Sequence, residues 1–397
     1  MSRVRTPLDP RLNSLELLFD PDSLSTLFGR PVKVNHLRWK RATSAVARLH
    51  DDDGVRWLAL YATDTSVKLE KTFRRALTHN LDLERFVLDD GVLASGPVPL
   101  DPRLYATLRP FRRAAPSPLW PRVQVLKYNP FRRVVFGLTV SGGLRLVGRA
   151  GSSTPSVTRG MLSELAAGGV PVLVPVDPAD LPSQLPSGRH VEYLPWYGNG
   201  DLSSLPHEDG EQAARQAGAA LALLHAQPPI HATLSWRAPA GRLRSLVREN
   251  TVLMPENHDR LARVQAQLEQ LLRRPGRAAV IHGDFSADQV LVDGKSVRLI
   301  DFERCSYGAA ASDLGSFAAV EALGAQQVDR RTILTLPRTA ALLDGYGVGP
   351  TTVNESEVLG WTCFYLLNRL REPFRACSPD WHAQLEHRLE MIEEVLW

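Results

Sequence analysis

The feature that most constrains the fold and chemistry of this chain is a strand–loop–hairpin segment between residues 280 and 303. An apolar run ends at His282-Gly283-Asp284, and the two apolar runs that follow are joined by Asp293-Gly294. Short apolar runs bounded by turn residues are typical of strands, and Asp-Gly tolerates the positive φ of a tight hairpin turn. The last run leads directly into Asp301. The segment therefore predicts two carboxylates, each beside a short strand.

The residue types in these loops are those that phosphoryl transfer requires. Asp284 can align an acceptor hydroxyl and take up its proton late, while the amide oxygen of Gln289 and the carboxylate of Asp301 can hold magnesium against nucleotide phosphates. His282 is a second candidate catalytic residue, but its position favours a structural role in which the imidazole bonds nearby backbone. Glu303 either supports the metal ligands or is simply solvated.

This segment resembles the catalytic loop and metal-binding segment of the aminoglycoside phosphotransferase and choline kinase-like family, whose members are small-molecule relatives of protein kinases. Three further segments match in the same order along the chain: the hinge between lobes, the first helix of the large lobe and the helix after the metal loop, at residues 191–195, 217–225 and 312–317. The resemblance covers roughly residues 120 to 397. Actinobacterial maltokinase-like and glucosamine-kinase-like members are most similar, because they also carry Gln at this metal position and an extra N-terminal domain.

The resemblance implies an α+β fold, namely a bilobal protein-kinase-like fold with an antiparallel-sheet small lobe, a mostly helical large lobe and an N-terminal cap domain. We expect the cap at residues 1–115, the small lobe at 116–195 and the large lobe at 196–397. A Pro-rich stretch from Ala114 to Pro121 reads as the linker between the first two. Hydrophobic patterning predicts strands and helices, with strands at 32–39, 44–49, 55–62, 123–128, 133–140, 144–150 and 171–176 and helices at 157–167, 261–272 and 381–395.

Phosphate anchoring departs from the family pattern, which places Lys on the third small-lobe strand and pairs it with a helix Glu. In this chain Arg149 stands at the Lys position and Glu164 is the expected partner, with Lys127 as the substitute if Arg149 points outward. A guanidinium can clamp the α- and β-phosphates, although its planar fork does not reproduce a point-charge ammonium. Strand alternation predicts Val147 and Arg149 on one face and Gly148 on the other.

A turn at residues 129–133 replaces the glycine-rich phosphate loop, since no G-x-G-x-x-G or Walker motif occurs there. Arg132 or Arg133 could reach phosphate, or could be an ordinary edge-strand charge that discourages aggregation. In the hinge, the resemblance places adenine against the backbone of three consecutive residues, Glu192, Tyr193 and Leu194.

The resemblance implies an ATP- and Mg²⁺-dependent kinase that transfers the γ-phosphoryl group to a hydroxyl of a small molecule such as a sugar, amino sugar or aminoglycoside. ATP and GTP are both open as donors. The alternative is a degenerate kinase that binds nucleotide and acts as a regulatory protein. Departures at Arg149 and Gln289 motivate this alternative, whereas retention of Asp284 and Asp301 argues against it. Acidic residues in the acceptor pocket would favour an amine-bearing substrate, and the candidates are Glu321, Asp344, Glu372 and Asp380.

Composition limits the partners and the compartment. The net charge of +4 is spread along the sequence, without a Lys/Arg cluster interleaved with aromatics, so we expect no nucleic acid. The three cysteines lack metal-ligand spacing and fit a reducing cytoplasm. The first thirteen residues are polar and Pro-interrupted, unlike a signal peptide, and no apolar run approaches the length of a membrane span. We therefore expect a cytoplasmic protein without membrane contact, whose oligomeric state the sequence leaves open.

Overall fold

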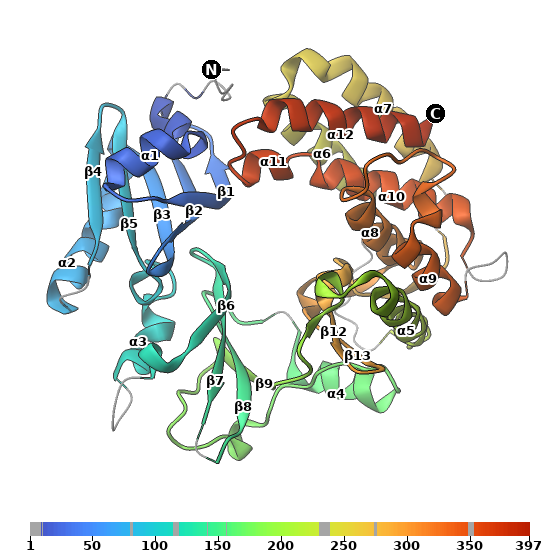
Figure 1. The fold of residues 1–397 in the computed structure, drawn as a ribbon, viewed down its shortest axis with the longest axis horizontal. Helices are drawn as coiled ribbons and strands as arrows, with labels where there is room; N and C mark the ends of the chain where they lie inside the picture. Colours follow the sequence, from blue (N-terminus) through green and yellow to red (C-terminus); the bar gives the residue numbers. More distant parts are fainter. Residues whose placement is uncertain are drawn as a thin grey trace. The chain divides into compact units, whose positions relative to one another are not determined.

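The computed structural model describes residue 9 and residues 11–79, 82–113, 119–140, 142–155, 157–229, 239–273, 276–347 and 353–397. The chain forms two compact units, which Figure 1 shows as ribbons coloured along the sequence. Unit 1 contains residues 1–155, 175–196 and 372–383, and unit 2 contains residues 156–174, 197–371 and 384–397.

The first sheet of unit 1 is a five-stranded antiparallel sheet with the order β1-β2-β3-β5-β4 (Figure 1). Its strands are β1 (Lys33–Lys40), β2 (Ser44–Asp51), β3 (Gly54–Ala62), β4 (Glu84–Leu88) and β5 (Gly91–Pro97). The helical elements around them are η1 (Asn13–Phe19), α1 (Pro21–Phe28), η2 (Thr63–Leu69), α2 (Glu70–His79), η3 (Val98–Leu100) and α3 (Tyr105–Arg113). The strands predicted at 32–39, 44–49 and 55–62 are confirmed.

The second sheet of unit 1 is four-stranded and antiparallel, with the order β6-β7-β8-β9. Its strands are β6 (Gln124–Asn129), β7 (Arg133–Thr139), β8 (Arg145–Gly151) and β9 (Val191–Pro195), with the short helices η4 (Trp120–Arg122) and η5 (Pro178–Asp180) beside them in the chain. The strand predicted at 171–176 is wrong: only Val172 makes a single bridge, to Leu299. Pro171 and Pro175 have no N–H to donate, which limits a ladder there.

One hydrophobic cluster packs the two sheets of unit 1 together. It includes Trp57 from β3, Phe111 from α3, Phe136 from β7 and Tyr193 from β9, all of them buried. Because both sheets share this core, residues expected to be a separate cap and small lobe fall into one unit. The division at residue 115 stays a prediction, and residues 114–118 of the expected linker lie outside the described residues.

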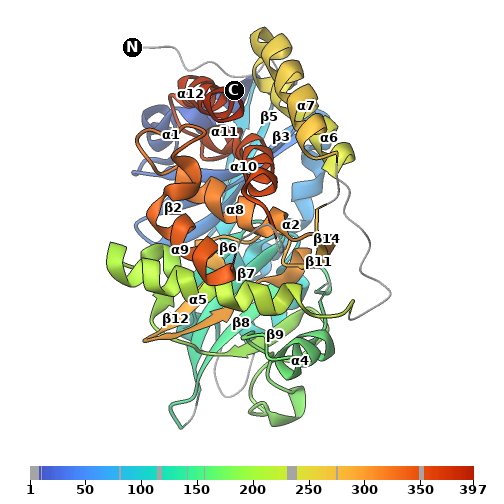
Figure 2. The ribbon, with the colours of Figure 1, turned by 90° about the vertical axis from the view of Figure 1, so that its right-hand side faces the viewer.

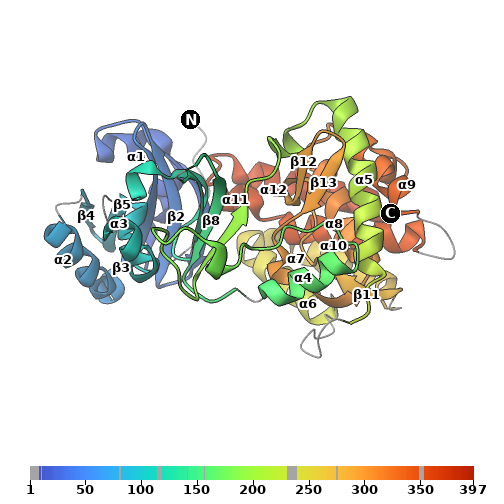
Figure 3. The same cartoon turned by 90° about the horizontal axis from the view of Figure 1, so that it is seen from below.

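Unit 2 is mostly helical and carries two small antiparallel sheets, β10-β12-β13 and β11-β14. Helices α5 and α9 pack side by side, as do α8 and α10 (Figure 2), and the β12–β13 hairpin packs on α5 (Figure 3). The helices of unit 2 are α4 (Arg159–Ala167), α5 (His207–His225), α6 (Pro239–Leu253), α7 (His258–Leu271), α8 (Ala311–Ala322), α9 (Pro337–Tyr346) and α10 (Glu355–Arg369). Its strands are β10 (Gly200–Asp201), β11 (Ala278–Ile281), β12 (Val290–Asp293), β13 (Ser296–Leu299) and β14 (Ser306–Ala309).

The shorter elements of unit 2 are the 3₁₀ helices η6 (Leu202–Ser204), η7 (Pro255–Asn257), η8 (Ala287–Gln289), η9 (Phe302–Arg304) and η10 (Ile333–Thr335). Helix α11 (Glu372–Arg375) belongs to unit 1, where it packs on β1, and α12 (Trp381–Leu396) begins in unit 1 and ends in unit 2. Within the described ranges, no helix is both long and apolar enough to cross a membrane.

Close approach of α8 and α10 depends on one glycine. A Cβ atom added to Gly315 would lie 2.6 Å from both the backbone nitrogen of Thr362 and the Cβ of Trp361. Such distances lie well inside van der Waals contact, so a larger residue would push the two helices apart. This contact sets the position of Trp361 relative to the helix that follows the metal loop.

Candidate active site

The strand–loop–hairpin segment forms as the sequence predicts. The β12–β13 hairpin turns at Asp293 and Ser296, and Ile300 donates its N–H to the Gln289 carbonyl at 3.0 Å, one step beyond the last strand pair. The His282 Nε2 atom bonds the Ile300 carbonyl at 2.8 Å. These contacts bring the catalytic loop, Gln289 and the start of the Asp301 loop to the open end of one hairpin.

A buried carboxylate holds the catalytic loop in place. Asp313, in the first turn of α8, accepts the backbone N–H groups of His282 and Gly283 at 2.6 and 2.8 Å. Its Oδ2 also lies 3.1 Å from Nε2 of His225 at the end of α5, and Nδ1 of His225 lies 2.9 Å from the Tyr346 hydroxyl of α9. Burial raises the pKa of Tyr346 to about 12, which keeps its hydroxyl as a donor. Three helices therefore converge on the backbone just before Asp284.

His282 belongs to this support rather than to the accessible site. Its side chain is fully buried, and its ring centroid lies 5.6 Å from that of Phe285 and 4.7 Å from that of Phe302. These ring contacts, together with the bond to the Ile300 carbonyl, are those expected if His282 has a structural role. A buried imidazole in this position can orient the loop through its bond to the Ile300 carbonyl.

Asp284 itself is accessible and paired. Its side chain is 37% exposed, and its Oδ2 lies 3.4 Å from Nη1 of Arg304 in η9. The sequence reasoning did not single out Arg304, because the pair joins two loops that are distant in sequence and no local pattern marks it. A molecule that approaches Asp284 therefore meets a guanidinium as well as the carboxylate.

Gln289 and Asp301 offer two oxygen ligands of the kind that magnesium prefers. Gln289 is buried, and its Nε2 donates to Oδ2 of Asp288 at 3.0 Å, which directs its amide oxygen away from Asp288. Asp301 has a left-handed backbone with φ 64° and ψ 51°, a conformation that costs of order 1 kcal/mol or more for a residue with a Cβ. In the described part of the chain, no group of three or more His, Cys, Asp or Glu side chains could hold a metal ion.

Two side chains expected near the nucleotide phosphates, Lys127 and Arg149, lie in one row across the second sheet of unit 1. Lys127 on β6 is opposite Val135, Val135 is opposite Arg149, and Arg149 is opposite Glu192. Directly opposed residues project from the same face of a sheet. Arg149 Nη1 and Glu192 Oε2 lie 3.1 Å apart, and burial raises the pKa of Glu192 against the opposing effect of Arg149. Glu164 lies on α4 in unit 2, so its pairing with Arg149 stays a prediction.

The strand register around Arg149 agrees with the sequence prediction. Leu146, Gly148 and Ala150 are buried on one face of β8, and Val147 and Arg149 are half-buried on the other. A Cβ atom on Gly148 would lie 2.3 Å from the Phe136 ring. The absence of a side chain at Gly148 therefore leaves room for the ring of Phe136, its partner on β7, in this register.

The turn that replaces a glycine-rich loop is held by side chains from the first part of the chain. Asp101 is buried, and its Oδ2 accepts the Phe131 N–H at 2.7 Å and the Tyr128 hydroxyl at 2.6 Å. Arg48 donates to the Tyr128 carbonyl at 3.2 Å, and Arg38 donates to the carbonyl of Pro130. Phe131 has φ 64°, so this turn reaches a left-handed conformation without a glycine. We call this set of contacts the turn clamp.

The remaining predicted nucleotide contacts are placed by β7 and β9. Arg133 begins β7 opposite Asn129 and is half-buried. Tyr193 on β9 is buried, its hydroxyl donates to the Pro186 carbonyl at 2.7 Å, and its own carbonyl accepts the Val176 N–H at 2.8 Å. Glu192 and Leu194, its neighbours in β9, pair with β8. The second segment of unit 1 ends at Trp196, directly after this strand. Adenine binding at 192–194 stays a prediction.

Comparison with known proteins agrees with this geometry. The model of the phosphotransferase enzyme family matches residues 158–346, which contain the catalytic loop, both proposed metal ligands and the Asp313 support. A search of curated protein sequences gave no match. The matched segment is just under half of the chain.

Several solved structures of phosphotransferases and kinases are similar to this chain. Aminoglycoside phosphotransferase APH(4)-Ia superposes with a TM-score of 0.50 and 13% identity, over 72% of this chain and 96% of that one. Spectinomycin phosphotransferase APH(9)-Ia, solved with ADP and spectinomycin, gives 0.48 and 14% over 69% and 88%. A choline/ethanolamine kinase family protein from Mesorhizobium loti gives 0.46 and 16% over 73% and 94%. The predicted kinase-like fold is confirmed by APH(4)-Ia, and the match of residues 158–346 to the phosphotransferase enzyme family supports a small-molecule kinase.

Proposed function

We propose that the protein transfers the γ-phosphoryl group of ATP to a hydroxyl group of a small molecule, with Mg²⁺ as the metal ion. The observation that carries this proposal is the backbone arrangement at the open end of the β12–β13 hairpin. There Ile300, next to Asp301, bonds both Gln289 and His282, and Asp313 holds the two residues before Asp284. A protein that only binds nucleotide does not need an accessible carboxylate held in this way.

In the proposed reaction, the acceptor hydroxyl donates a hydrogen bond to Asp284, which aligns the oxygen for in-line attack on the γ-phosphorus. As the new O–P bond forms and the bond to the bridging oxygen of ADP breaks, the hydroxyl proton passes to Asp284. The loose transition state needs little early deprotonation, so positioning contributes more than basicity. The backbone bonds to Asp313 supply that positioning, because they fix the two residues before Asp284.

Gln289 and Asp301 would hold Mg²⁺ through an amide and a carboxylate oxygen. When bound, the ion would neutralise charge on the phosphates. Arg149 and Lys127, on one face of the second sheet, are our candidates for contact with the phosphates, and Arg133 is a further one. Support for nucleotide use comes from related structures solved with ADP, AMP and GDP. ATP as the donor is part of the proposal.

Two measurements test the proposal, beginning with the melting temperature in the presence of Mg-ATP and Mg-GTP. Ligand at a hundredfold excess over Kd stabilises the folded state by about 2.7 kcal/mol. We expect a shift with Mg-ATP, and we expect Asp301→Ala to remove its magnesium-dependent part. No shift with either nucleotide would contradict both the kinase and the nucleotide-binding alternative.

The second measurement is ADP release in the presence of hydroxyl acceptors. Asp284→Asn should keep the Mg-ATP shift and lower turnover at least about a hundredfold, the usual scale for a positioned base. Asp293→Asn is the matched control, because it makes the same change at the exposed turn of the same hairpin and Asn-Gly also favours that turn. Equal turnover in the two variants would remove Asp284 from the mechanism. Nucleotide binding without any transfer would favour the regulatory alternative.

A further inference from the structure

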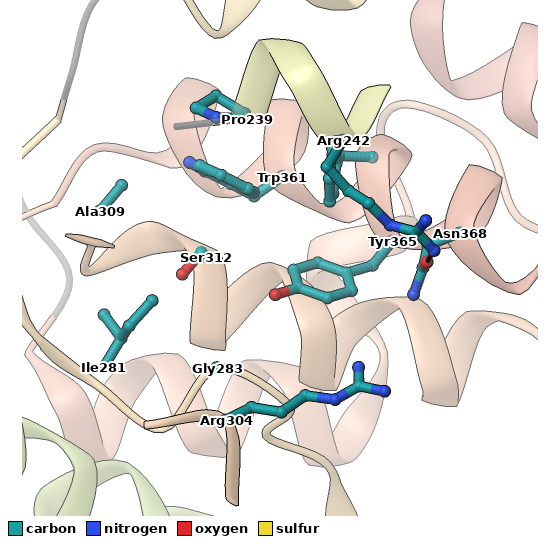
Figure 4. A pocket seen from close by; sticks show the side chains of 11 residues that line it. Pro239, Arg242, Ile281, Gly283, Arg304, Ala309, Ser312, Trp361, Tyr365 and Asn368 are labelled. Atoms are coloured by element: carbon teal, nitrogen blue, oxygen red, sulfur yellow. Dashed lines mark hydrogen bonds between the residues drawn. The ribbon is translucent and has the colours of Figure 1, made fainter. Parts of the chain in front are cut away.

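A cavity of about 330 Å³ in unit 2 opens beside the catalytic loop (Figure 4). Gly283, the neighbour of Asp284, is part of its lining, and so is Arg304, whose guanidinium pairs with Asp284. A molecule in this cavity therefore lies next to the carboxylate that we assign to the acceptor hydroxyl. The cavity lies wholly within unit 2, so its composition bears directly on the acceptor.

One wall of the cavity is an aromatic stripe on α10. Trp361, Phe364, Tyr365 and Asn368 line it, a spacing that places them on one side of a helix. The Trp361 and Phe364 ring centroids lie 5.1 Å apart, and the close contact of Trp361 with Gly315 fixes the stripe against α8. A rigid aromatic wall of this kind suits a ring compound with an apolar face.

The charged side chains that line the cavity are all basic. They are Arg242 and Arg304, and among the described residues no carboxylate side chain lines it. Figure 4 shows the Tyr365 ring between these two guanidinium groups. The segment 230–238, which precedes the lining residue Pro239, contains no Asp or Glu in its sequence.

The acidic residues expected to attract an amine-bearing substrate make other contacts or lie in unit 1. Two carboxylate oxygens of Glu321 accept backbone N–H groups of Arg338 and Thr339 at 3.0 and 2.6 Å, so Glu321 supports the start of α9. Asp344 pairs with Arg215 on the surface. Glu372 and Asp380 belong to unit 1.

Two hydrogen bonds hold the Arg242 guanidinium in place, and the groups around it carry more positive than negative charge. Its Nη1 donates to Glu249 at 3.0 Å and its Nη2 to the Asn368 side-chain oxygen at 2.9 Å. Glu249 also pairs with Arg371, so one carboxylate serves two guanidinium groups. Arginine in such an arrangement is well suited to a carboxylate or phosphate group.

We infer that the acceptor is a hydroxyl-bearing ring compound that carries an anionic group, either a carboxylate or a phosphate, which Arg242 binds. A polycationic aminoglycoside does not suit this cavity, because its ammonium groups would face two arginines. The inference rests on the proposed function, since it identifies the substrate class of the same site.

Binding of chosen probes tests the inference independently of turnover. The probes are glucuronate and glucose 6-phosphate as anions, glucose as the neutral reference, and glucosamine and kanamycin as cations, all at one ionic strength. Binding is followed by tryptophan fluorescence, and the signal that disappears in Trp361→Phe is assigned to the cavity. We expect at least one anionic probe to bind about tenfold or more tightly than glucose, and the cations to bind more weakly than glucose. Tighter binding of a cation, or no preference for either anion over glucose, would overturn the inference.

Variants on α6 identify the residue responsible. Arg242→Gln should reduce the preference for the anion about tenfold. Arg248→Gln is the matched control, because Arg248 is exposed on the same helix and donates a hydrogen bond to Ser245 at 3.4 Å. Equal preferences in the two variants would remove Arg242 from the argument. Failure of the proposed function has a different signature, namely no stabilisation by Mg-ATP and no ADP release with any probe. Failure of this inference leaves transfer intact but directed to neutral or cationic acceptors.

Discussion

Replacing the buried carboxylate Asp313 with Asn should cost this protein a large part of its stability. The carboxylate accepts three donors, which are the backbone N–H groups of His282 and Gly283 and the Nε2–H of His225. Asn has one oxygen where Asp has two, so its NH₂ group must face one of those donors. A lost charge-assisted hydrogen bond costs about 1.5–3 kcal/mol, and an unsatisfied buried donor about 1–3 kcal/mol more. We therefore expect a loss of about 3–5 kcal/mol in the free energy of unfolding.

Urea denaturation followed by circular dichroism measures this loss, with the slope m compared between variants to confirm the same unfolding transition. Asp344→Asn is the control, because it makes the same change in an exposed ion pair with Arg215 and should cost less than about 1 kcal/mol. Asp313→Asn should also lower turnover at temperatures where it stays folded, since the loop before Asp284 loses its support. A cost within 1 kcal/mol of the control would refute the argument that Asp313 holds the loop.

Three further changes test other parts of the fold. Burial and the nearby Arg48 lower the pKa of His36 to about 4. Because the unfolded chain then binds more protons between pH 4 and 6.5, the free energy of unfolding should fall as pH drops through this window. With solvent screening included, we expect a loss of about 2 kcal/mol. His36→Asn keeps a residue that tolerates φ 60°, and urea titrations at pH 7 and 4.5 should show a smaller pH effect in it. Gly148→Ala should cost about 1–3 kcal/mol through the clash with Phe136. Gly160→Ala should not destabilise, because its Cβ would meet only Thr158 Oγ1 at 3.8 Å, an ordinary contact; equal midpoints would contradict this account of the register. Gly315→Ala should separate α8 from α10 and weaken the Trp361-dependent fluorescence response, and an unchanged response would contradict the role of that contact.

The sequence predicted those parts of the site that depend on local patterns. The Asp293-Gly294 turn and its flanking apolar runs determine the β12–β13 hairpin, and strand alternation determines the side to which Arg149 projects. Both follow from neighbours within a few residues. The prediction of a strand at 171–176 was wrong because it gave the apolar residues more weight than the two prolines, which limit a ladder there.

The contacts that the sequence did not predict join residues far apart in the chain. Asp313 is 30 and 31 residues from the backbone groups that it holds and 88 residues from His225. Glu192 as the partner of Arg149 depends on the pairing of β8 with β9, and the basic lining of the cavity depends on the packing of α6 against α10. A buried aspartate at a helix start is a weak sequence signal, since the same pattern is usual for an exposed N-terminal turn.

The turn clamp has a consequence for how the chain can be divided. The kinase-like resemblance begins near residue 120, yet the turn at 129–133 owes its hydrogen bonds to Asp101, Arg38 and Arg48. A shortened chain that starts at the resemblance would leave the Tyr128 hydroxyl, buried in the whole protein, without its acceptor and would free a backbone that is now ordered in advance. Any nucleotide that uses this turn would then have to supply the ordering entropy itself on binding. The first hundred residues thus support the turn at 129–133 within unit 1, and autonomy of the remaining segment is not to be expected from its resemblance alone.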